Sequence, residues 1–153
     1  MRSRIIEKKE EIVEIIQKCQ VCHVSMVDPG GKPYLIPMNF GFDRDVVYLH
    51  SSRTGKKIEI LKNNPDVCIN FTSDHTLRYQ DENVACSWSM KYRSVLVYGK
   101  VEFVEDAGEK IAHLDRGMKQ YTQKEFKYNP PSLREVCCWK VFVEKYEGRV
   151  YGY

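Results

Sequence analysis

The residues best suited to chemistry are the eight from 50 to 57, His-Ser-Ser-Arg-Thr-Gly-Lys-Lys. Arg53, Lys56 and Lys57 stand where a helix is expected to begin, and cations are unfavourable there because the exposed amides already carry about half a positive charge. A phosphate would offset them, since helix amides, hydroxyls and lysines all donate to its oxygens and Gly55 lets the backbone come close. The alternative is a solvated helix start whose lysines face water.

The elements around this segment must place it at a strand-to-helix turn. Residues 46–49, Val-Val-Tyr-Leu, form a short β-rich run. Thr54 can then cap a short helix, which the Asn-Asn-Pro of residues 63–65 ends. Dinucleotide-binding and P-loop glycine motifs are absent from the sequence, so the pattern indicates another kind of phosphate loop.

Hydrophobic periodicity over the rest of the chain predicts mostly hairpin-connected strands. An amphipathic helix is expected over 4–18, and later elements are strands at 21–27, 32–42, 67–72, 88–104 and 136–143, with a loop over 73–83. Gly99 is a candidate bulge, and Asp106 with Glu109 resembles a capping box before a third helix. About six strands and three helices predict a mainly β, α+β fold: one domain over 1–153, an antiparallel split β-barrel with flanking helices.

The bulk composition excludes several classes of protein. The 24 basic and 21 acidic residues leave a formal charge of +3, too balanced for a dedicated binder of nucleic acid or membrane surfaces. No apolar run is long enough to span a bilayer, so we expect a cytoplasmic protein. The CxxC of Cys19 and Cys22 lacks a second pair with suitable spacing, because Cys137 and Cys138 are adjacent, and no metal site is expected.

Three stretches carry a resemblance to a known family. They are PYLIPMNFGF at 33–42, YLHSSRTGKKIEILKNNPDVCINF at 48–71 and YRSVLVYGKVEFVED at 92–106. Their order resembles the pyridoxamine 5′-phosphate oxidase-like FMN-binding split barrels, and within that superfamily the nitroimidazole-resistance branch. The resemblance covers residues 12–106, with YxHSxxxGxK as its most specific element.

The resemblance implies FMN as the cofactor and assigns residues to it. The phosphate site corresponds to Ser51, Ser52, Lys56 and Lys57, and the isoalloxazine is expected along Pro37, Met38 and Asn39. In these proteins the flavin lies at a two-fold interface, which implies a homodimer. The strand of Tyr92, Arg93 and Ser94 is then expected to close the site, from the same chain or from its partner. An ion pair on the surface is the alternative role for Arg93.

His50 is the candidate catalytic residue, since it ends the strand just ahead of the phosphate loop. A histidine here could position a substrate or the phosphate, whereas one at a strand end can also be structural. Trp88 and Trp139 could stack on the flavin or line the substrate space, with core packing as the alternative for at least one of them. His113, like His23 and His75, has no comparable context.

The predicted activity is an oxidoreductase in which electrons from a nicotinamide reach a small acceptor, a nitroaromatic or a quinone, through the flavin. No triad or pair of carboxylates is evident, and flavin chemistry needs none. A flavin-binding or storage protein without turnover is the first alternative. The second is the same barrel binding haem or a deazaflavin, although the lysines of the loop favour FMN.

Overall fold

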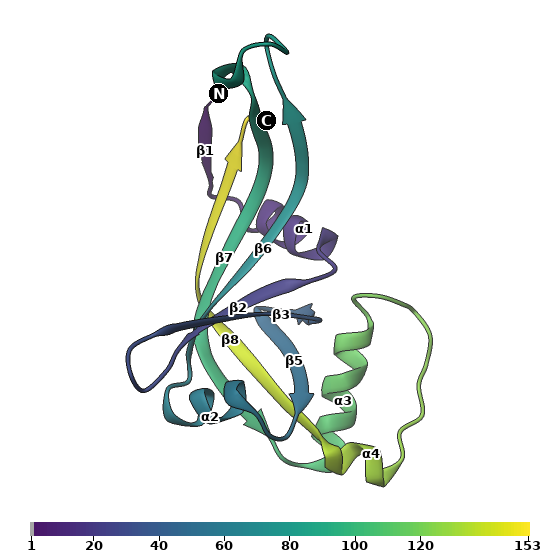
Figure 1. Cartoon of the computed structure of the whole chain (residues 1–153). Helices are drawn as coiled ribbons and strands as arrows, with labels where there is room; N and C mark the ends of the chain where they lie inside the picture. Colours follow the sequence, from purple (N-terminus) through teal and green to yellow (C-terminus); the bar gives the residue numbers. More distant parts are fainter. Residues whose placement is uncertain (1) are drawn as a thin grey trace.

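The computed structural model describes residues 2–153 and is built around three long antiparallel strands. These are β6 (Asp66–Arg78), β7 (Ser89–Val104) and β8 (Val136–Tyr151), which run the length of the molecule in Figure 1. The sheet has the order β3-β2-β6-β7-β8-β5-β4, and β1 pairs with the far end of β8. All of these pairings are antiparallel, so the predicted class, a mainly β split barrel with flanking helices, is confirmed.

The remaining elements are short and surround these strands. The other strands are β1 (Ser3–Ile6), β2 (Cys22–Val27), β3 (Pro33–Met38), β4 (Gly41–Asp43) and β5 (Val46–Ser52). The helices are α1 (Lys9–Lys18), α2 (Lys56–Asn63), α3 (Ala107–Met118) and α4 (Pro130–Glu135), with a 3₁₀ turn at Ala85–Ser87. In Figure 1, α1 lies beside the upper half of the long strands, while α2, α3 and α4 lie at the lower end.

The core forms where the alternating apolar faces of the strands meet the helices. Phe40, Phe71 and Trp139 are all 2% exposed or less, and Phe40 packs edge-on against Phe71 with 4.9 Å between ring centroids. Burying a large side chain of this kind contributes about 1.5–3 kcal/mol. Trp139 is therefore a core residue, which settles its two predicted roles in favour of packing.

The N-terminal prediction is wrong in part, because residues 3–6 form β1 rather than the first turn of a helix. Ile6 is buried and Ile5 is 67% exposed, as strand alternation requires. The partner of β1 is the end of β8, with Ser3 opposite Tyr151. Because the two paired strands are almost a whole chain length apart in sequence, nothing in residues 3–6 alone indicates a strand. The helix that follows, α1, is amphipathic as predicted.

Two further predicted boundaries are wrong for similar reasons. The stretch 73–83 was expected to be a loop, but β6 continues to Arg78 through a register shift between Ser73 and Thr76. The last strand extends from the predicted 136–143 to Tyr151. Both extensions pair with β7. The end of β6 is mostly exposed and polar, so it lacks an apolar face. In the end of β8 only Gly148 and Val150 are buried, between charged residues, which is a weak strand signal.

The counts of six strands and three helices become eight strands and four α-helices in the described residues. The predicted strand 32–42 is divided between β3 and β4, and the stretch around Asn129 holds an unpredicted helix, α4. Asn129 accepts a hydrogen bond from the Ser132 amide, and a proline occupies the first position of α4. The bulge at Gly99 and the cap by Asp106 are confirmed.

Candidate functional site

A cleft of about 360 Å³ opens where the ends of β3 and β5 meet the start of α2. It is lined by Ile36, Pro37, Met38, Asn39, His50, Ser51, Ser52 and Lys57. Pairing of β5 with β8 and of β2 with β3 fixes the two strand ends, and the three residues between β5 and α2 bring the helix start beside them. We call this hollow the groove. Seven of the eleven residues predicted from the sequence line it.

The start of α2 is arranged to accept an anion. Gly55, not the predicted Thr54, is the N-cap residue; its φ of 120° is a conformation that favours glycine. No side chain caps the helix, so the amides of its first turn keep free hydrogen-bonding capacity. Ser51 donates to the Ser52 carbonyl and Ser52 to the Thr54 carbonyl, both at exposed positions where a stronger acceptor can compete. Hydroxyls, helix amides and a lysine together suit a phosphate.

The three cations predicted at this helix start have different surroundings. Lys57 lines the groove, and within residues 2–153 its ammonium group has no ion pair and no side-chain hydrogen bond. Arg53 donates to the Arg134 carbonyl at 2.7 Å, at the end of α4. The Lys56 ammonium lies 4.6 Å from the centre of the Tyr34 ring. Lys57 is therefore the cation left uncompensated beside the groove.

His50 stands where three hollows of the surface meet. Besides the groove, it lines a pocket of about 410 Å³ beside α3 and an open hollow beside α4. Desolvation by the surrounding groups lowers the pKa of His50 below its ordinary value, which favours the neutral ring at pH 7. A neutral imidazole can both donate and accept a hydrogen bond toward a ligand.

His113 on α3 lies directly behind this strand end and is only 3% exposed. Its Nε2 is 2.7 Å from the Leu49 carbonyl, which can only accept, so this ring nitrogen donates. Nδ1 is buried and has no partner among the described residues. Burial lowers the pKa of His113 to about 4, and the ring is neutral. His113 thus fixes the backbone immediately before His50, a role for which its sequence context gave no signal.

Tyr121, just beyond α3, holds the other side of the groove. Its hydroxyl oxygen accepts from the Phe40 amide at 3.0 Å and from the Asn39 side-chain amide at 3.3 Å. The same hydroxyl donates to the Gln20 carbonyl at 2.8 Å. These bonds join segments about 80 to 100 residues apart in sequence. Sequence reasoning therefore missed Tyr121 as a residue that positions Asn39.

The strand of Tyr92, Arg93 and Ser94 does not reach the groove of the same chain. His50 is paired with Cys138 of β8, whereas Arg93 is paired with Val150, so about 40 Å of strand separates them. Only a second copy of the chain could bring this strand to the groove.

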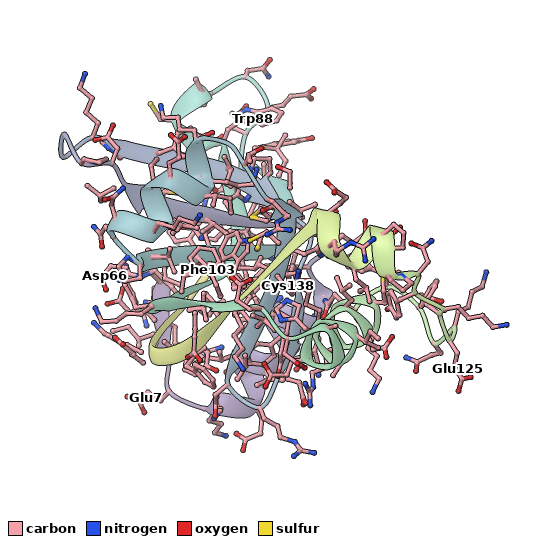
Figure 2. All side chains as sticks on the ribbon, turned by 90° about the horizontal axis from the view of Figure 1, so that it is seen from below. Glu7, Asp66, Trp88, Phe103, Glu125 and Cys138 are labelled. Atoms are coloured by element: carbon pink, nitrogen blue, oxygen red, sulfur yellow. The ribbon has the colours of Figure 1, made fainter. Side chains whose placement is uncertain are left out.

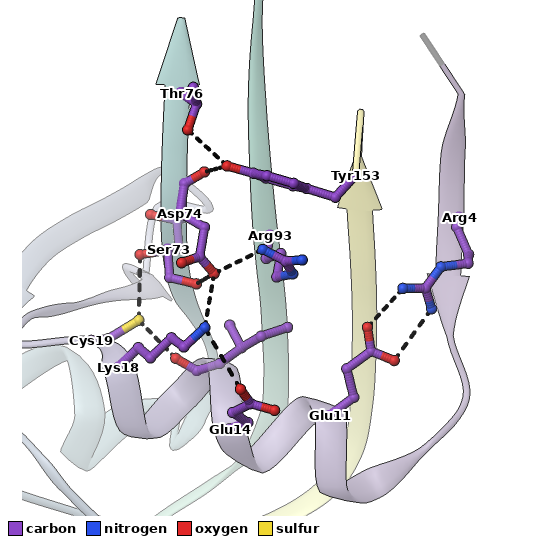
Figure 3. Close-up of polar contacts among 12 residues, drawn as sticks. Arg4, Glu11, Glu14, Lys18, Cys19, Ser73, Asp74, Thr76, Arg93 and Tyr153 are labelled. Atoms are coloured by element: carbon purple, nitrogen blue, oxygen red, sulfur yellow. Dashed lines mark hydrogen bonds and ion pairs between the residues drawn. The ribbon is translucent and has the colours of Figure 1, made fainter.

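Arg93 belongs to a polar group at the upper end of the molecule, shown in Figure 3. Its guanidinium is 3.2 Å from the Asp74 carboxylate and 4.1 Å from the centre of the Tyr153 ring. Lys18 and the Ser73 hydroxyl also reach Asp74, at 3.4 Å and 2.9 Å. We call these five residues the Asp74 cluster.

Two other predicted features lie outside the groove. Trp88 stacks on Tyr79 at 4.2 Å between centroids, at the tip of the β6–β7 hairpin. No group of three His, Cys, Asp or Glu side chains suited to a metal ion occurs in residues 2–153. Cys19 and Cys22 are buried, and burial raises the pKa of both thiols, which keeps them protonated. Among the described helices none is long and apolar enough to cross a membrane.

A β-barrel of this topology with a phosphate-type groove at a strand-to-helix turn defines the class of split-barrel proteins. The family model described as pyridoxamine 5′-phosphate oxidase matches residues 8–150. A solved structure of a candidate 5-nitroimidazole antibiotic resistance protein from Bacteroides thetaiotaomicron is 44% identical. Its TM-score is 0.88, and the match covers 97% of this chain and 87% of that one. The chain therefore belongs to the pyridoxamine 5′-phosphate oxidase family.

More distant structures share the fold alone. A flavocytochrome from Azotobacter vinelandii is 19% identical with a TM-score of 0.82, over 99% of this chain and 70% of that one. A FAD- and haem-binding protein from Mycobacterium smegmatis is 16% identical with a TM-score of 0.84, over 97% and 74%. No curated protein matches the chain.

Proposed function

We propose that this chain binds FMN in the groove and acts as a reductase of a small acceptor. The observation that carries the proposal is the meeting of Lys57, two serine hydroxyls and the uncapped start of α2 beside the end of β3. Phosphate suits this donor set because charge-assisted hydrogen bonds to it are about twice as strong as neutral ones. The ring of the cofactor would lie along Pro37, Met38 and Asn39.

When bound, FMN supplies the electron-transfer chemistry, and this chain supplies binding and orientation. Lys57, Ser51 and Ser52 would hold the phosphate end. Tyr121 keeps Asn39 in place through the bond to its side-chain amide. His50, neutral at pH 7, would hydrogen-bond a ligand at the junction of the hollows. The 44% identical protein, named for 5-nitroimidazole resistance, supports a nitroaromatic acceptor.

A homodimer is part of this proposal. A second copy would bring the strand of Tyr92, Arg93 and Ser94 to the groove, which one chain leaves open on that side. Light scattering after size-exclusion chromatography tests it. A mass near twice the 18.0 kDa of the chain is expected, and a monomer that still binds FMN would show that the groove is complete in one chain.

The activity is tested by absorption spectra of the purified protein, recorded after FMN is added and again after a reduced nicotinamide is added without oxygen. Bound flavin whose bands bleach and return with a nitroaromatic acceptor is the expected result. Flavin bands that persist with the nicotinamide would instead identify a flavin-binding protein without this reductase activity. A haem band with no uptake of flavin would contradict the proposal.

A further inference from the structure

The pocket beside α3, next to the groove, has aromatic walls, and the residues proposed to hold the phosphate do not line it. It encloses about 410 Å³ between α3, the segment 119–129 and the start of β4, a volume in the range of small-molecule sites. Phe40, Tyr121, Phe126 and Tyr128 supply its rings, and Met118 adds a thioether. Figure 1 shows the segment after α3 looping away from the sheet and returning at α4, and Figure 2 shows Glu125 at its outer edge.

Two of the large side chains of this pocket are accessible, whereas Phe40 is buried. Phe126 is 40% exposed and Tyr121 is 39% exposed. The two tyrosine hydroxyls of the pocket already donate hydrogen bonds within the chain. Tyr128 donates to the Asp115 carboxylate at 2.7 Å, and Tyr121 donates to the Gln20 carbonyl. These residues can therefore contact a ligand mainly through the faces of their rings, which favours a flat aromatic ligand.

The pocket and the groove adjoin each other. Asn39 and His50 line both, so a molecule in the pocket would lie next to whatever lies along the end of β3. The formal charge on the pocket lining is also of one sign, positive. Lys127 is the only charged residue among those that line it, is exposed, and has no ion pair or side-chain hydrogen bond within residues 2–153.

We propose that this pocket is the binding site for the acceptor, and that it takes a single flat aromatic ring whose anionic substituent faces Lys127. The inference rests on the proposed function, because it identifies the pocket as the place from which the acceptor meets the flavin. Aromatic walls select the ring, Lys127 selects its charge, and Asn39 with His50 hydrogen-bonds the edge that faces the groove.

Gly117 offers a way to fill the pocket without disturbing the fold. It lines the pocket on α3, and a Cβ built on it meets no atom within 4 Å. Gly117→Leu therefore puts a side chain into open space and favours the helix, since glycine is about 1 kcal/mol poorer than good helix formers. Ala112→Leu is the matched control, because Ala112 is exposed on the same helix and lines none of these hollows.

The experiment measures binding of 4-nitrobenzoate and of uncharged nitrobenzene to the full chain by ligand-observed NMR, with and without saturating FMN. The acid should bind about threefold more tightly than nitrobenzene, the effect of one exposed ion pair. Gly117→Leu should weaken its binding at least about tenfold, while Ala112→Leu changes nothing. Lys127→Met, which keeps the aliphatic stem, should abolish the preference for the acid.

Unchanged binding of 4-nitrobenzoate by Gly117→Leu would show that this pocket is not its binding site. Equal affinity of the wild-type chain for 4-nitrobenzoate and nitrobenzene would contradict the proposed preference for an anionic ring. Titration with FMN in the same variants separates this inference from the proposed function. The FMN dissociation constant should stay within about twofold in Gly117→Leu. A wild-type chain that binds 4-nitrobenzoate but no FMN would reject the proposed function and, with it, the acceptor role of the pocket.

Discussion

The groove and the Asp74 cluster both contain cations, but the surroundings of the charge differ between them. In the cluster, Arg93 and Lys18 share the carboxylate of Asp74, and Arg93 also lies on the Tyr153 ring. Beside the groove, Lys57 has no such partner in the described chain. Cations of the first kind stabilise the fold, whereas one of the second kind is available to a ligand.

The Asp74 cluster is built to hold chain segments together. Asp74 has a φ of 56° at the bulge in β6, and its carbonyl accepts from the Tyr153 hydroxyl, which ties down the C-terminal tail. Burial acts to raise the pKa of Asp74, but hydrogen bonds from Ser73 and Lys18 outweigh it and leave the pKa below its ordinary value. Asp74 is therefore ionised at neutral pH and binds α1 to β6 and β7.

The largest effect expected from this comparison is on cofactor binding. Lys57→Ala should raise the dissociation constant of FMN about 30-fold, because a charge-assisted hydrogen bond worth about 2 kcal/mol is lost. The free energy of unfolding without FMN should change by less than about 0.5 kcal/mol, since the Lys57 ammonium has no ion pair or side-chain hydrogen bond within residues 2–153. Titration by flavin fluorescence and urea denaturation check the two values. Loss of stability with unchanged FMN affinity would show that Lys57 stabilises the fold and does not bind the cofactor.

The region behind the groove relies on a neutral histidine, which makes stability depend on pH. The pKa of His113 is about 4 in the folded chain against 6.5 for the free side chain, so the unfolded state binds the extra proton first as pH falls. The free energy of unfolding should thus fall by about 2 kcal/mol between pH 7 and pH 4.5. The lowered pKa of His50 acts in the same direction.

His113→Gln provides the control for this pH dependence. The glutamine amide can still donate to the Leu49 carbonyl but does not titrate. Urea denaturation at the two pH values should therefore show a smaller decrease in the variant. An equal decrease in both proteins would assign the acid sensitivity to other groups.

A smaller effect is expected where charges are already paired. Asp74→Asn keeps the shape of the side chain and tolerates the positive φ, but it removes the charge facing Arg93 and Lys18. The free energy of unfolding should fall by about 1 kcal/mol, and FMN affinity should not change. The same titration and denaturation measurements test this. A marked loss of FMN affinity with unchanged stability would show that Asp74 serves to orient Arg93 toward the flavin of a second copy and not to stabilise the fold.

The smallest effect is expected from the neighbour of Lys57. Lys56→Ala should weaken FMN binding by no more than about threefold, since its ammonium lies over the Tyr34 ring and acts on the groove only as an exposed charge nearby. The ratio of the FMN dissociation constants of the two alanine variants is the measurement. A Lys56 variant as weak as the Lys57 variant would place both ammonium groups on the phosphate.

Local signals predicted the parts of the molecule that adjacent residues determine. The strand-to-helix turn at His50–Lys57 has the predicted form because turn chemistry, charge and apolar spacing all act within a few residues. The capping by Asp106 and the bulge at Gly99 were evident for the same reason. The packing of Ile58 and Leu61 against the core follows directly from their spacing on α2.

Features that depend on distant partners could not be predicted in this way. Strand β1 exists because it pairs with the end of β8, and Tyr121 reaches Asn39 only after α3 has packed near β4 and β5. The sequence also cannot show that Arg53 donates to the Arg134 carbonyl while Lys57 has no such partner in the part of the chain that the structure describes. All eleven predicted site residues stay predictions as FMN contacts; seven of them line the groove, whereas Lys56, Tyr92, Arg93 and Ser94 do not.

The central claim is that the groove recognises a phosphate, and it is tested most directly by titrating the flavin-free chain with FMN and with riboflavin, which lacks the phosphate. Two or more charge-assisted hydrogen bonds predict that FMN binds at least about 100-fold more tightly. The preference should collapse in Lys57→Ala. Equal affinity of the wild-type chain for the two flavins would contradict the account.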